Sequence, residues 1–348
     1  MDKKNVAIVG YGGQGAWHAD HALNSDVVSL AGIFDIKEAR NELAASKGIR
    51  VYRSFKELIS DETVDIVVVA TPNDVHEKYA VAAMKAGKHV ICEKPVTLSL
   101  RSFDRMIDAA NKSGVKFSVH QNRRWDVDYL AMKQVIESGM IGDVINVESR
   151  IHGSRGIPSD WRGMAKYGGG MLYDWGVHII DQTLMLIGFD VKTVYCTFDH
   201  ITNDEVDDGF RLNIETKAGK KAYLEVGTYN FIPMPRFYMR GTKGTAKIED
   251  WQKKCEVAIM KAWNEKEVLP VQTAAGITKT MAPRDELTLD YKTIDRPVSD
   301  VHDFYRNFVG AINGECEQLI LHEQSRKVLE VIFAAFDSAK KQRPVELK

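Results

Sequence analysis

Short apolar runs alternate with helical patterns through the first third of the chain. The expected strands are Asn5–Val9, Val28–Phe34, Asp65–Ala70, His89–Cys92 and Lys116–His120, with a short one near Val51. The expected helices are Gln14–Leu23, Lys37–Lys47, Phe55–Ser60, Val75–Ala86 and Leu100–Lys112. The Asp65–Ala70 run is apolar throughout, which is typical of a parallel strand covered on both faces. The pattern predicts an α/β domain with a parallel sheet over residues 1–122.

The rest of the chain has a different pattern, with alternating strands. Phe210–Thr216 alternates apolar and polar residues, which indicates an antiparallel strand with one covered face. Further strands are expected at Val144–Ile151, Tyr223–Phe231, Phe237–Arg240 and Thr245–Glu249. Helices are expected at Asp128–Ser138, at Asp174–Ile187 before Gly188, after a cap at Ser299, and at His322–Lys341. Leu269–Asp290 has no convincing pattern and is interpreted as a surface excursion. Residues 123–348 should form a second α/β domain, and a broad sheet with an uncovered face favours a homo-oligomer, a dimer or a tetramer.

Composition restricts the kinds of binding partner and the cellular compartment that we expect for this protein. The 348 residues are 44% hydrophobic and 27% charged with a formal net charge of −1, so no general electrostatic attraction to nucleic acid or anionic membrane is expected. No apolar run approaches the ~18 residues of a membrane span, and residues 1–5 do not resemble a signal-peptide core. The four cysteines lie far apart and form no CxxC pair. We expect a cytoplasmic protein with free thiols and no metal site.

A glycine-rich turn follows the first strand directly. Gly10, Gly12 and Gly15 stand in the order G-x-G-x-x-G between a strand and a helix, and Gly13 and Gln14 complete the turn. This context indicates a Rossmann dinucleotide site, with the pyrophosphate on the helix N-terminus. Asp35 ends the second strand, where an acid accepts a ribose hydroxyl of NAD and repels the 2′-phosphate of NADP. The sequence favours NAD, although Lys37 nearby leaves dual specificity open.

Other candidate cofactor contacts follow the later strands. Ligands of open α/β sheets bind beyond the carboxyl ends of the strands, which selects Thr71, Pro72 and Asn73. His76 could reach the same crevice or be structural. Lys94 ends the fourth strand, where it could orient a substrate hydroxyl or carry its proton, or simply pair with Glu93.

The stretch 168–178 carries the second group of candidates. Three glycines at 168–170 indicate a loop where backbone passes close to another group. Asp174 and His178 follow four residues apart on an expected helix, a spacing at which a carboxylate can orient an imidazole as a general base. Asp181 is an alternative partner for His178. The long loop before the glycines adds candidate contacts to substrate hydroxyls or cofactor, namely Arg155, Arg162 and Tyr167.

These motifs together resemble the Gfo/Idh/MocA oxidoreductases, the family of glucose-fructose oxidoreductase and inositol dehydrogenase. The resemblance is carried by Gly10-x-Gly12-x-x-Gly15, Glu93-Lys94-Pro95 and Asp174-x-Gly176-x-His178. It implies a Rossmann domain followed by an α/β domain with a large, mostly antiparallel, open sheet. It also implies that Lys94, Asp174 and His178 form the catalytic group and contact the substrate. The remaining residues that the resemblance places near cofactor or substrate are Glu93, Asn122, Arg124, Trp161 and Arg162.

The resulting expectation is an NAD-dependent dehydrogenase or reductase of a sugar, polyol or glycoside. Hydride would pass between the nicotinamide and a carbon that bears a hydroxyl. Two alternatives remain open at this point. One is redox-neutral, NAD-assisted glycoside cleavage, and the other is a non-catalytic NAD or sugar sensor.

Overall fold

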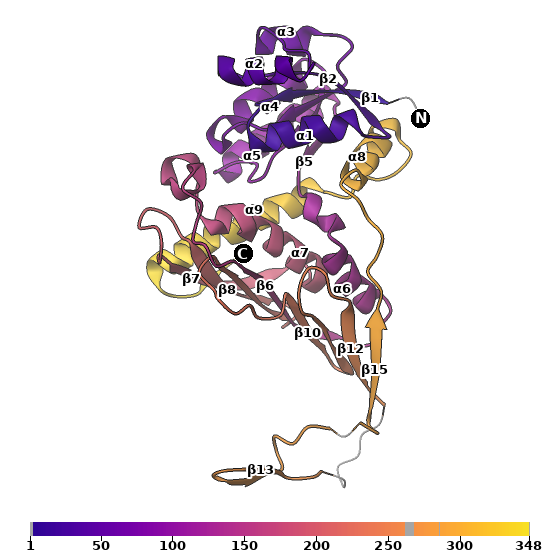
Figure 1. Cartoon of the computed structure of the whole chain (residues 1–348), viewed down its shortest axis with the longest axis vertical. Coiled ribbons are helices and arrows are strands. Elements are labelled where there is room, and N and C mark those ends of the chain that lie inside the picture. The colour runs from indigo at the N-terminus through magenta and orange to yellow at the C-terminus, as the bar shows by residue number, and fades with distance from the viewer. Residues whose placement is uncertain (1–2, 262–267, 285, 348) are drawn as a thin grey trace.

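The structure is a computed structural model that describes residues 3–261, 268–284 and 286–347. The strands of these residues form a five-stranded sheet, a nine-stranded sheet and a two-stranded hairpin. Figure 1 shows the five-stranded sheet and its helices at one end of the molecule and the nine-stranded sheet below them. The fold class expected from the sequence is confirmed.

The first sheet is parallel and has the order β2-β1-β3-β4-β5. Its strands are β1 (Lys4–Val9), β2 (Val28–Phe34), β3 (Ile66–Val69), β4 (His89–Cys92) and β5 (Phe117–Val119). The helices between them are α1 (Gly13–Leu23), α2 (Glu38–Ser46), α3 (Phe55–Ser60), α4 (His76–Lys85) and α5 (Leu100–Ser113). The strand expected near Val51 is only an isolated bridge to Ile33. The order reverses between β1 and β3, the position at which doubly wound sheets bind nucleotides.

The second sheet has the order β15-β12-β11-β10-β6-β9-β8-β7-β16. Its strands are β6 (Val144–His152), β7 (Val191–Asp199), β8 (Gly209–Thr216), β9 (Lys221–Gly227), β10 (Phe237–Gly241), β11 (Gly244–Ile248), β12 (Cys255–Met260), β15 (Leu289–Ile294) and β16 (Val345–Glu346). β6 and β9 pair in parallel and the other neighbours pair antiparallel. The sheet is therefore mixed but mostly antiparallel, as expected.

Helices cover one face of this sheet. Figure 1 shows α6 (Val127–Glu137), α7 (Val177–Ile187) and α9 (His322–Lys341) between the sheet and the Rossmann domain, and no helix of the described residues on the other face. This layer brings α7 close to the carboxyl ends of the parallel strands.

α8 (Asp303–Asn313) returns to the first domain after the second sheet is complete. Phe304, Tyr305 and Phe308 share a buried cluster with Val6 and Ile8 of β1. The expected domain boundary at residue 122 divides the chain by sequence position alone. In the packed structure, α8 belongs to the core of the Rossmann domain.

The expected cap of this helix is corrected by the structure. The helix begins at Asp303 rather than next to Ser299. The Ser299 hydroxyl donates a hydrogen bond of 2.7 Å to the Asp303 carboxylate instead of accepting one from a backbone N–H.

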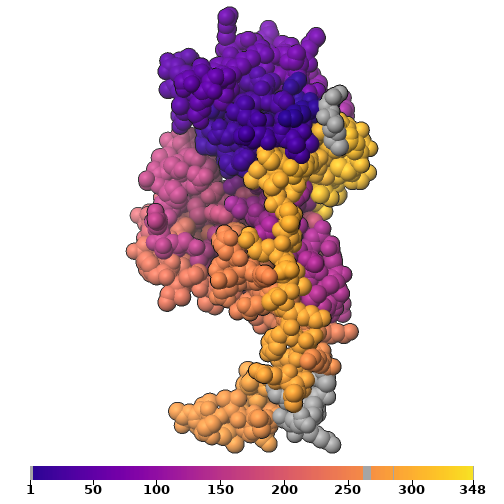
Figure 2. Space-filling view, turned by 45° about the vertical axis from the view of Figure 1, so that its right-hand side comes forward, coloured from indigo at the N-terminus to yellow at the C-terminus, as the bar shows by residue number. Residues whose placement is uncertain are grey.

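An arm extends from the edge strand β15 and its neighbour β12 in the second sheet. It contains the hairpin of β13 (Val271–Thr273) and β14 (Gly276–Thr278), within the expected surface excursion. Figures 1 and 2 show it projecting from the body of the molecule, in orange in Figure 2. In the part of the chain that the structure describes, no helix is long and apolar enough to cross a membrane.

Candidate active site

A pocket with a volume of about 520 Å³ lies between the two domains. The Rossmann domain contributes the ends of β4 and β5 and Gln14 of the glycine turn. The second domain contributes the end of β6, the segment that leads from β6 to α7, and the first turn of α7. Lys94, Asp174 and His178, which the sequence predicts to act together, all line this pocket.

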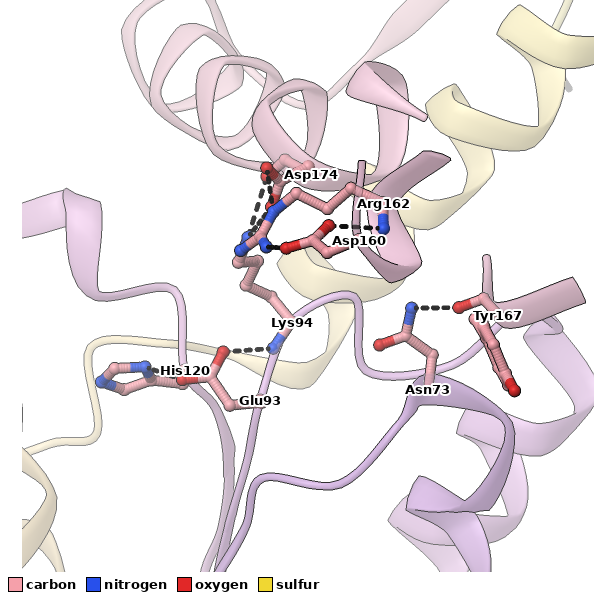
Figure 3. A network of polar contacts seen from close by, with 8 residues as sticks. All are labelled: Asn73, Glu93, Lys94, His120, Asp160, Arg162, Tyr167 and Asp174. Carbon is pink, nitrogen blue, oxygen red and sulfur yellow. Dashed lines mark hydrogen bonds and ion pairs between the residues drawn. The ribbon is translucent and has the colours of Figure 1, made fainter. Parts of the chain in front are cut away.

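Lys94 reaches across the domain boundary to Asp174. Its Nζ donates to Asp174 Oδ1 at 2.8 Å and to the Asp174 backbone carbonyl at 3.0 Å. Arg162 Nε donates to the other carboxylate oxygen at 3.0 Å, and Figure 3 shows the three side chains converging. Burial opposes ionisation of Asp174, but Lys94 and Arg162 hold the pKa of its carboxyl below the ordinary value. Two cations and one anion are therefore fixed at the same wall of the pocket.

This arrangement corrects the expected partnership of Asp174 with His178. Both oxygens of Asp174 are engaged by cations, and His178 Nδ1 has no hydrogen-bond partner among the described residues. Charge-assisted bonds to Lys94 and Arg162 are stronger than a bond to a neutral imidazole. Asp181, the alternative partner, is paired with Arg124 instead. His178 thus lines the pocket without a carboxylate to orient it.

His178 is a neutral imidazole at pH 7. Burial and then the nearby charges of Lys94 and Arg123 lower its pKa well below the ordinary value. A neutral ring keeps one nitrogen lone pair available for a proton.

The glycine loop places Asp174 in the wall through close backbone contacts. A Cβ on Gly169 would lie 2.3 Å from the Arg162 carbonyl oxygen, and Gly170 has φ +102°. Asp207 then accepts a hydrogen bond of 2.8 Å from Leu172 N–H, at the start of a π-helical turn over Leu172–Gly176. Burial raises the pKa of Asp207 to about 7. The close approach predicted for the three glycines is present, whereas Asp207 carried no recognisable signal.

The glycine turn after β1 is shaped to receive a phosphate group. A Cβ on Gly15 would lie 1.8 Å from the Gly10 carbonyl oxygen, so only glycine allows α1 to pack so closely on β1. Gly12 and Gly13 have no atom within 4 Å of a Cβ, which leaves the space above the turn open. Asp35 accepts hydrogen bonds from Tyr11 N–H and Lys37 N–H at 2.7 and 2.8 Å. The donor set fits a dinucleotide, with backbone N–H groups at the α1 N-terminus and a carboxylate at the β2 end.

The residues after β3 hold the crevice together. The Asn73 side-chain amide donates to the Tyr167 carbonyl oxygen at 3.1 Å, and this bond joins the two domains (Figure 3). His76 is buried between the carbonyl oxygens of Thr71 and Val96, at 2.9 and 3.2 Å. His76 therefore has the structural role that the sequence left open, while Thr71 and the exposed Pro72 stay cofactor candidates.

The structure places several expected substrate contacts away from the pocket lining. Arg124 is buried in a bidentate ion pair with Asp181 at 2.6 and 2.8 Å, and it also donates to Leu319 O and Gln324. Arg155 is exposed, and Tyr167 contributes its backbone to the bond with Asn73. The guanidinium of Arg162 lies 4.7 Å from the Trp161 ring centre. Arg162 and Asn122 do line the pocket.

Aromatic and arginine side chains that were not among the selected candidates also line the pocket, namely Arg123, Trp175 and Trp251. The Arg123 guanidinium lies 4.2 Å from the Trp175 ring centre and 5.9 Å from the Trp251 ring centre. Trp251 comes from the turn before β12, far along the chain from Arg123. Its place in the first turn of the expected helix, beside Asp174, was a weak signal for Trp175, and none was available for Trp251.

Glu93 lies beneath Lys94 in a buried cluster. Its Oε1 is 2.9 Å from His18 Nε2 and 2.8 Å from His120 Nδ1, and its Oε2 accepts from Lys94 N–H at 3.0 Å. Burial opposes ionisation, but His120 and His18 hold the pKa of Glu93 well below the ordinary value. The ligand atoms of His18, Glu93 and His120 lie within 4.8 Å of one another, close enough for a metal ion, and hydrogen bonding accounts for that proximity. The sequence predicted no metal and did not identify this cluster.

Comparisons with known proteins agree with this geometry. Residues 4–121 match the oxidoreductase family model with an NAD-binding Rossmann fold, and residues 129–247 match the GFO/IDH/MocA C-terminal domain. Together these models cover more than half of the chain. The chain belongs to the Gfo/Idh/MocA oxidoreductase family and has an NAD(P)-binding Rossmann domain.

Particular relatives differ in what their names state. An NAD-binding protein of Listeria innocua is 42% identical over the full length of both chains, with a TM-score of 0.94. The scyllo-inositol 2-dehydrogenase (NADP(+)) of Bacillus subtilis is 29% identical over 100% of this chain and 97% of its own. The myo-inositol 2-dehydrogenase of Thermotoga maritima is 31% identical over 58% of this chain and 60% of its own. The 2,7-anhydro-N-acetylneuraminate hydratase of Escherichia coli is 29% identical over 70% and 67%.

The placement of Arg124 leads to a testable prediction. Arg124→Met should destabilise the protein by about 3–5 kcal/mol, because it leaves the Asp181 carboxylate buried and unpaired. The double variant Arg124→Met/Asp181→Leu should recover most of this loss, and thermal unfolding measures both. Nucleotide affinity should not change in the double variant. Arg124 would instead be a ligand contact if the single variant kept its stability and lost substrate or nucleotide affinity.

Proposed function

We propose that this protein is an NAD-dependent oxidoreductase that transfers hydride between a nicotinamide and a hydroxyl-bearing carbon of a sugar, polyol or glycoside. The observation that carries the proposal is the Lys94–Asp174 pair, which joins a lysine beyond β4 to a carboxylate of the second domain next to His178. The open glycine turn and Asp35 provide the dinucleotide end of the same crevice. The two related inositol dehydrogenases support a polyol as the class of substrate.

Each polar group at the wall has a defined task in this proposal. The bound nicotinamide supplies the hydride acceptor. Lys94 donates a hydrogen bond to the reacting oxygen and stabilises the negative charge that develops on it. Asp174 and Arg162 hold Lys94 in position. His178 is neutral, and it accepts the hydroxyl proton.

The composition of the pocket supports a ligand rich in hydroxyl groups. The Trp175 and Trp251 rings line the pocket together with the charged and polar groups of Lys94, Arg162, Asp174 and His178. A flat apolar surface with a few converging polar groups is how proteins orient small ligands. A sugar or polyol offers both C–H faces and hydroxyl groups to such a site.

Asp35 supports NAD over NADP as the cofactor. Its carboxylate lies at the β2 end, held by two backbone N–H groups. A fixed negative charge there accepts ribose hydroxyl groups and repels a 2′-phosphate. The names of the relatives differ on this point, so the cofactor preference of this chain rests on its own Asp35.

A redox-neutral reaction is the second candidate function. The related hydratase carries a name that describes the addition or removal of water without net oxidation. The same Lys94 and His178 would serve transient oxidation of a ring hydroxyl, followed by elimination and return of the hydride. The presence of Lys94, Asp174 and His178 in one pocket argues against a third candidate, a non-catalytic NAD or sugar sensor.

We also propose that the protein is a cytoplasmic homo-oligomer in which the arm packs on a second copy of the chain. Leu269, Ile277, Met281 and Leu287 in or next to the arm are 79%, 67%, 80% and 84% exposed. The arm continues from β12 and β15, at the edge of a sheet with one face free of described helices. Large apolar side chains concentrated on such a projection favour a protein interface.

The first test is the absorbance of reduced nicotinamide on mixing the protein and NAD⁺ with a panel of sugars, polyols and glycosides. A sustained rise with one class of substrate is expected. Lys94→Met and His178→Gln should each lower kcat by about 10²-fold or more, because each removes a group that acts on the reacting oxygen. Lys166→Met, outside the pocket lining, is the matched control and should keep its activity.

Other outcomes of the same experiment discriminate between the candidates. Near-wild-type turnover in both pocket variants would show that the assigned roles are wrong. A flat trace with substrate consumed and NAD still bound after gel filtration would favour the redox-neutral reaction. NAD bound to the protein, with none of the candidate substrates consumed, would favour the sensor.

Asp35→Ser should shift the cofactor preference toward NADP⁺. Removing the carboxylate abolishes its repulsion of the 2′-phosphate and its bonds to the ribose, so the ratio of the two dissociation constants should change by about tenfold or more. Titrations of the wild type and the variant with NAD⁺ and NADP⁺ measure this ratio. The exposed Asp20→Ser variant of α1 is the control. Tighter binding of NADP⁺ than NAD⁺ by the wild-type protein would overturn the assignment.

Ile277→Asp/Met281→Asp should weaken self-association. Placing two charges in the apolar contact should convert an oligomer into a 39.1 kDa monomer in analytical ultracentrifugation. Leu23→Asp, at an exposed apolar position of α1, should leave the assembly intact. The role of the arm is refuted by a monomeric wild type or by an unchanged mass of the double variant.

A further inference from the structure

The carboxylate–imidazole pair expected at Asp174 and His178 occurs instead at Glu93 and His120. An ionised carboxylate only accepts hydrogen bonds, so His120 donates to Glu93 Oε1 through Nδ1–H and His18 donates through Nε2–H. The Tyr305 hydroxyl lies 2.5 Å from the remaining nitrogen of His18 and donates to it. Every polar atom of His18 and Glu93 is thereby satisfied. His120 Nε2 is buried and has no partner among the described residues.

The unpartnered nitrogen belongs to a ring that lines the pocket. His120 is 3% exposed and packs edge-on against Phe304, with ring centres 4.6 Å apart. It follows β5 as Glu93 follows β4, and both residues line the pocket with Lys94. Figure 3 shows Glu93 between Lys94 and the His120 ring. A buried polar atom without a partner indicates a missing ligand group or a proton site.

Sheet order assigns this end of the crevice to the nicotinamide. The adenosine end is defined by Asp35 after β2 and the pyrophosphate by the glycine turn after β1. In the order β2-β1-β3-β4-β5 the other half of a dinucleotide extends toward β4 and β5. Glu93 and His120 stand at the ends of those two strands.

We propose that His120 is the proton-storing residue of this site, whose Nε2 takes up a proton when the bound nicotinamide becomes reduced. The inference rests on the proposed oxidoreductase function. Oxidation of the alcohol breaks its C–H and O–H bonds; the hydride and its electron pair pass to the oxidised nicotinamide. The hydroxyl proton leaves through His178 and ends on His120 Nε2. The ring charge lost by the nicotinamide is thus replaced by one on the imidazole, next to the Glu93 carboxylate.

The groups around His120 are arranged for such an exchange of charge. The Glu93 carboxylate and the His18 ring contact His120 directly. The other titratable and charged groups nearby are Lys94, Arg123 and His178, which line the same pocket, and Tyr305 of α8, which bonds to His18. Burial and His120 lower the pKa of His18 to about 4, and burial raises the pKa of Tyr305 far above neutrality. Glu93 stays ionised and His178 neutral for the reasons given above. His120 is the imidazole with a carboxylate on one nitrogen and a free lone pair on the other.

The test compares the affinities for NAD⁺ and NADH as functions of pH, with chelator-dialysed protein and no substrate. A proton on His120 repels the cationic ring of NAD⁺ and not the neutral ring of NADH. As pH rises and the imidazole loses its proton, binding of NAD⁺ should therefore strengthen relative to NADH. The ratio of dissociation constants should change by about tenfold between pH 5.5 and 8.5.

His120→Gln keeps a polar side chain and removes the titration. It should bind both nucleotides with a ratio that is independent of pH, while His178→Gln should keep the wild-type dependence. His322→Gln, a partly buried imidazole bonded to the Phe117 carbonyl oxygen, is the control for loss of another histidine that is not in the pocket. A pH-independent ratio in the wild type, or an unchanged dependence in His120→Gln, would refute the role of His120.

A measurement on the unaltered protein covers the case in which His120→Gln does not fold. Exchange of bound NAD⁺ for NADH near pH 6.5 should take up part of a proton, measured by calorimetry in buffers of different ionisation enthalpy. Absence of proton uptake refutes the proposal. Failure to bind either nucleotide would refute the proposed function itself, whereas binding of both without proton linkage refutes only the His120 assignment.

Discussion

The site depends on one ion pair between two domains. Lys94 and Asp174 have side chains that are only 10% and 12% exposed, and each comes from a different domain. Removing either charge from water is costly unless the other is present and further hydrogen bonds satisfy it. Arg162 and the Asp174 backbone carbonyl provide those bonds. The pocket is therefore complete only when the two domains are docked.

The rest of the fold can be understood as what keeps that docking fixed. α8 crosses back and inserts Phe304 and Phe308 into the Rossmann core, and α9 packs against α5 on one side and β7 on the other. The Asn73–Tyr167 bond joins the loop after β3 to the loop before the glycines. Segments far along the chain from the motifs around Lys94 and Asp174 thus determine whether these two side chains meet. The motifs alone do not reveal this dependence.

Sequence patterns predicted the local part of this structure well. The alternation of strands and helices, the glycine turn and the glycines at 168–170 express local backbone requirements, and these leave a periodic or compositional trace. β7 alternates as clearly as β8 and could have been found, while β12 and β15 are short strands next to the arm. Residue spacing also selected Asp174 and His178 as neighbours, and the family resemblance added Lys94.

The sequence could not predict which side chains far apart along the chain bond to one another. A spacing of four residues suggested that Asp174 serves His178, but Lys94, 80 residues away, and Arg162 compete for the carboxylate. Glu93 was considered as a possible ion-pair partner of Lys94, whereas its carboxylate contacts the imidazole rings of His18 and His120. Such choices are decided by charge and burial once the fold is formed, and they have no period along the chain.

The same reasoning separates cofactor recognition from substrate recognition. The dinucleotide end depends on backbone geometry at Gly10 and Gly15, where a Cβ would lie only 2.5 and 1.8 Å from a backbone carbonyl oxygen. The proposed substrate end is built from side chains, with the Arg123 guanidinium 4.2 Å from the Trp175 ring centre and 5.9 Å from the Trp251 ring centre. Under the proposed function, relatives can share the fold and the dinucleotide-binding domain while differing in the reaction that their names describe, because side chains of the second domain line the pocket.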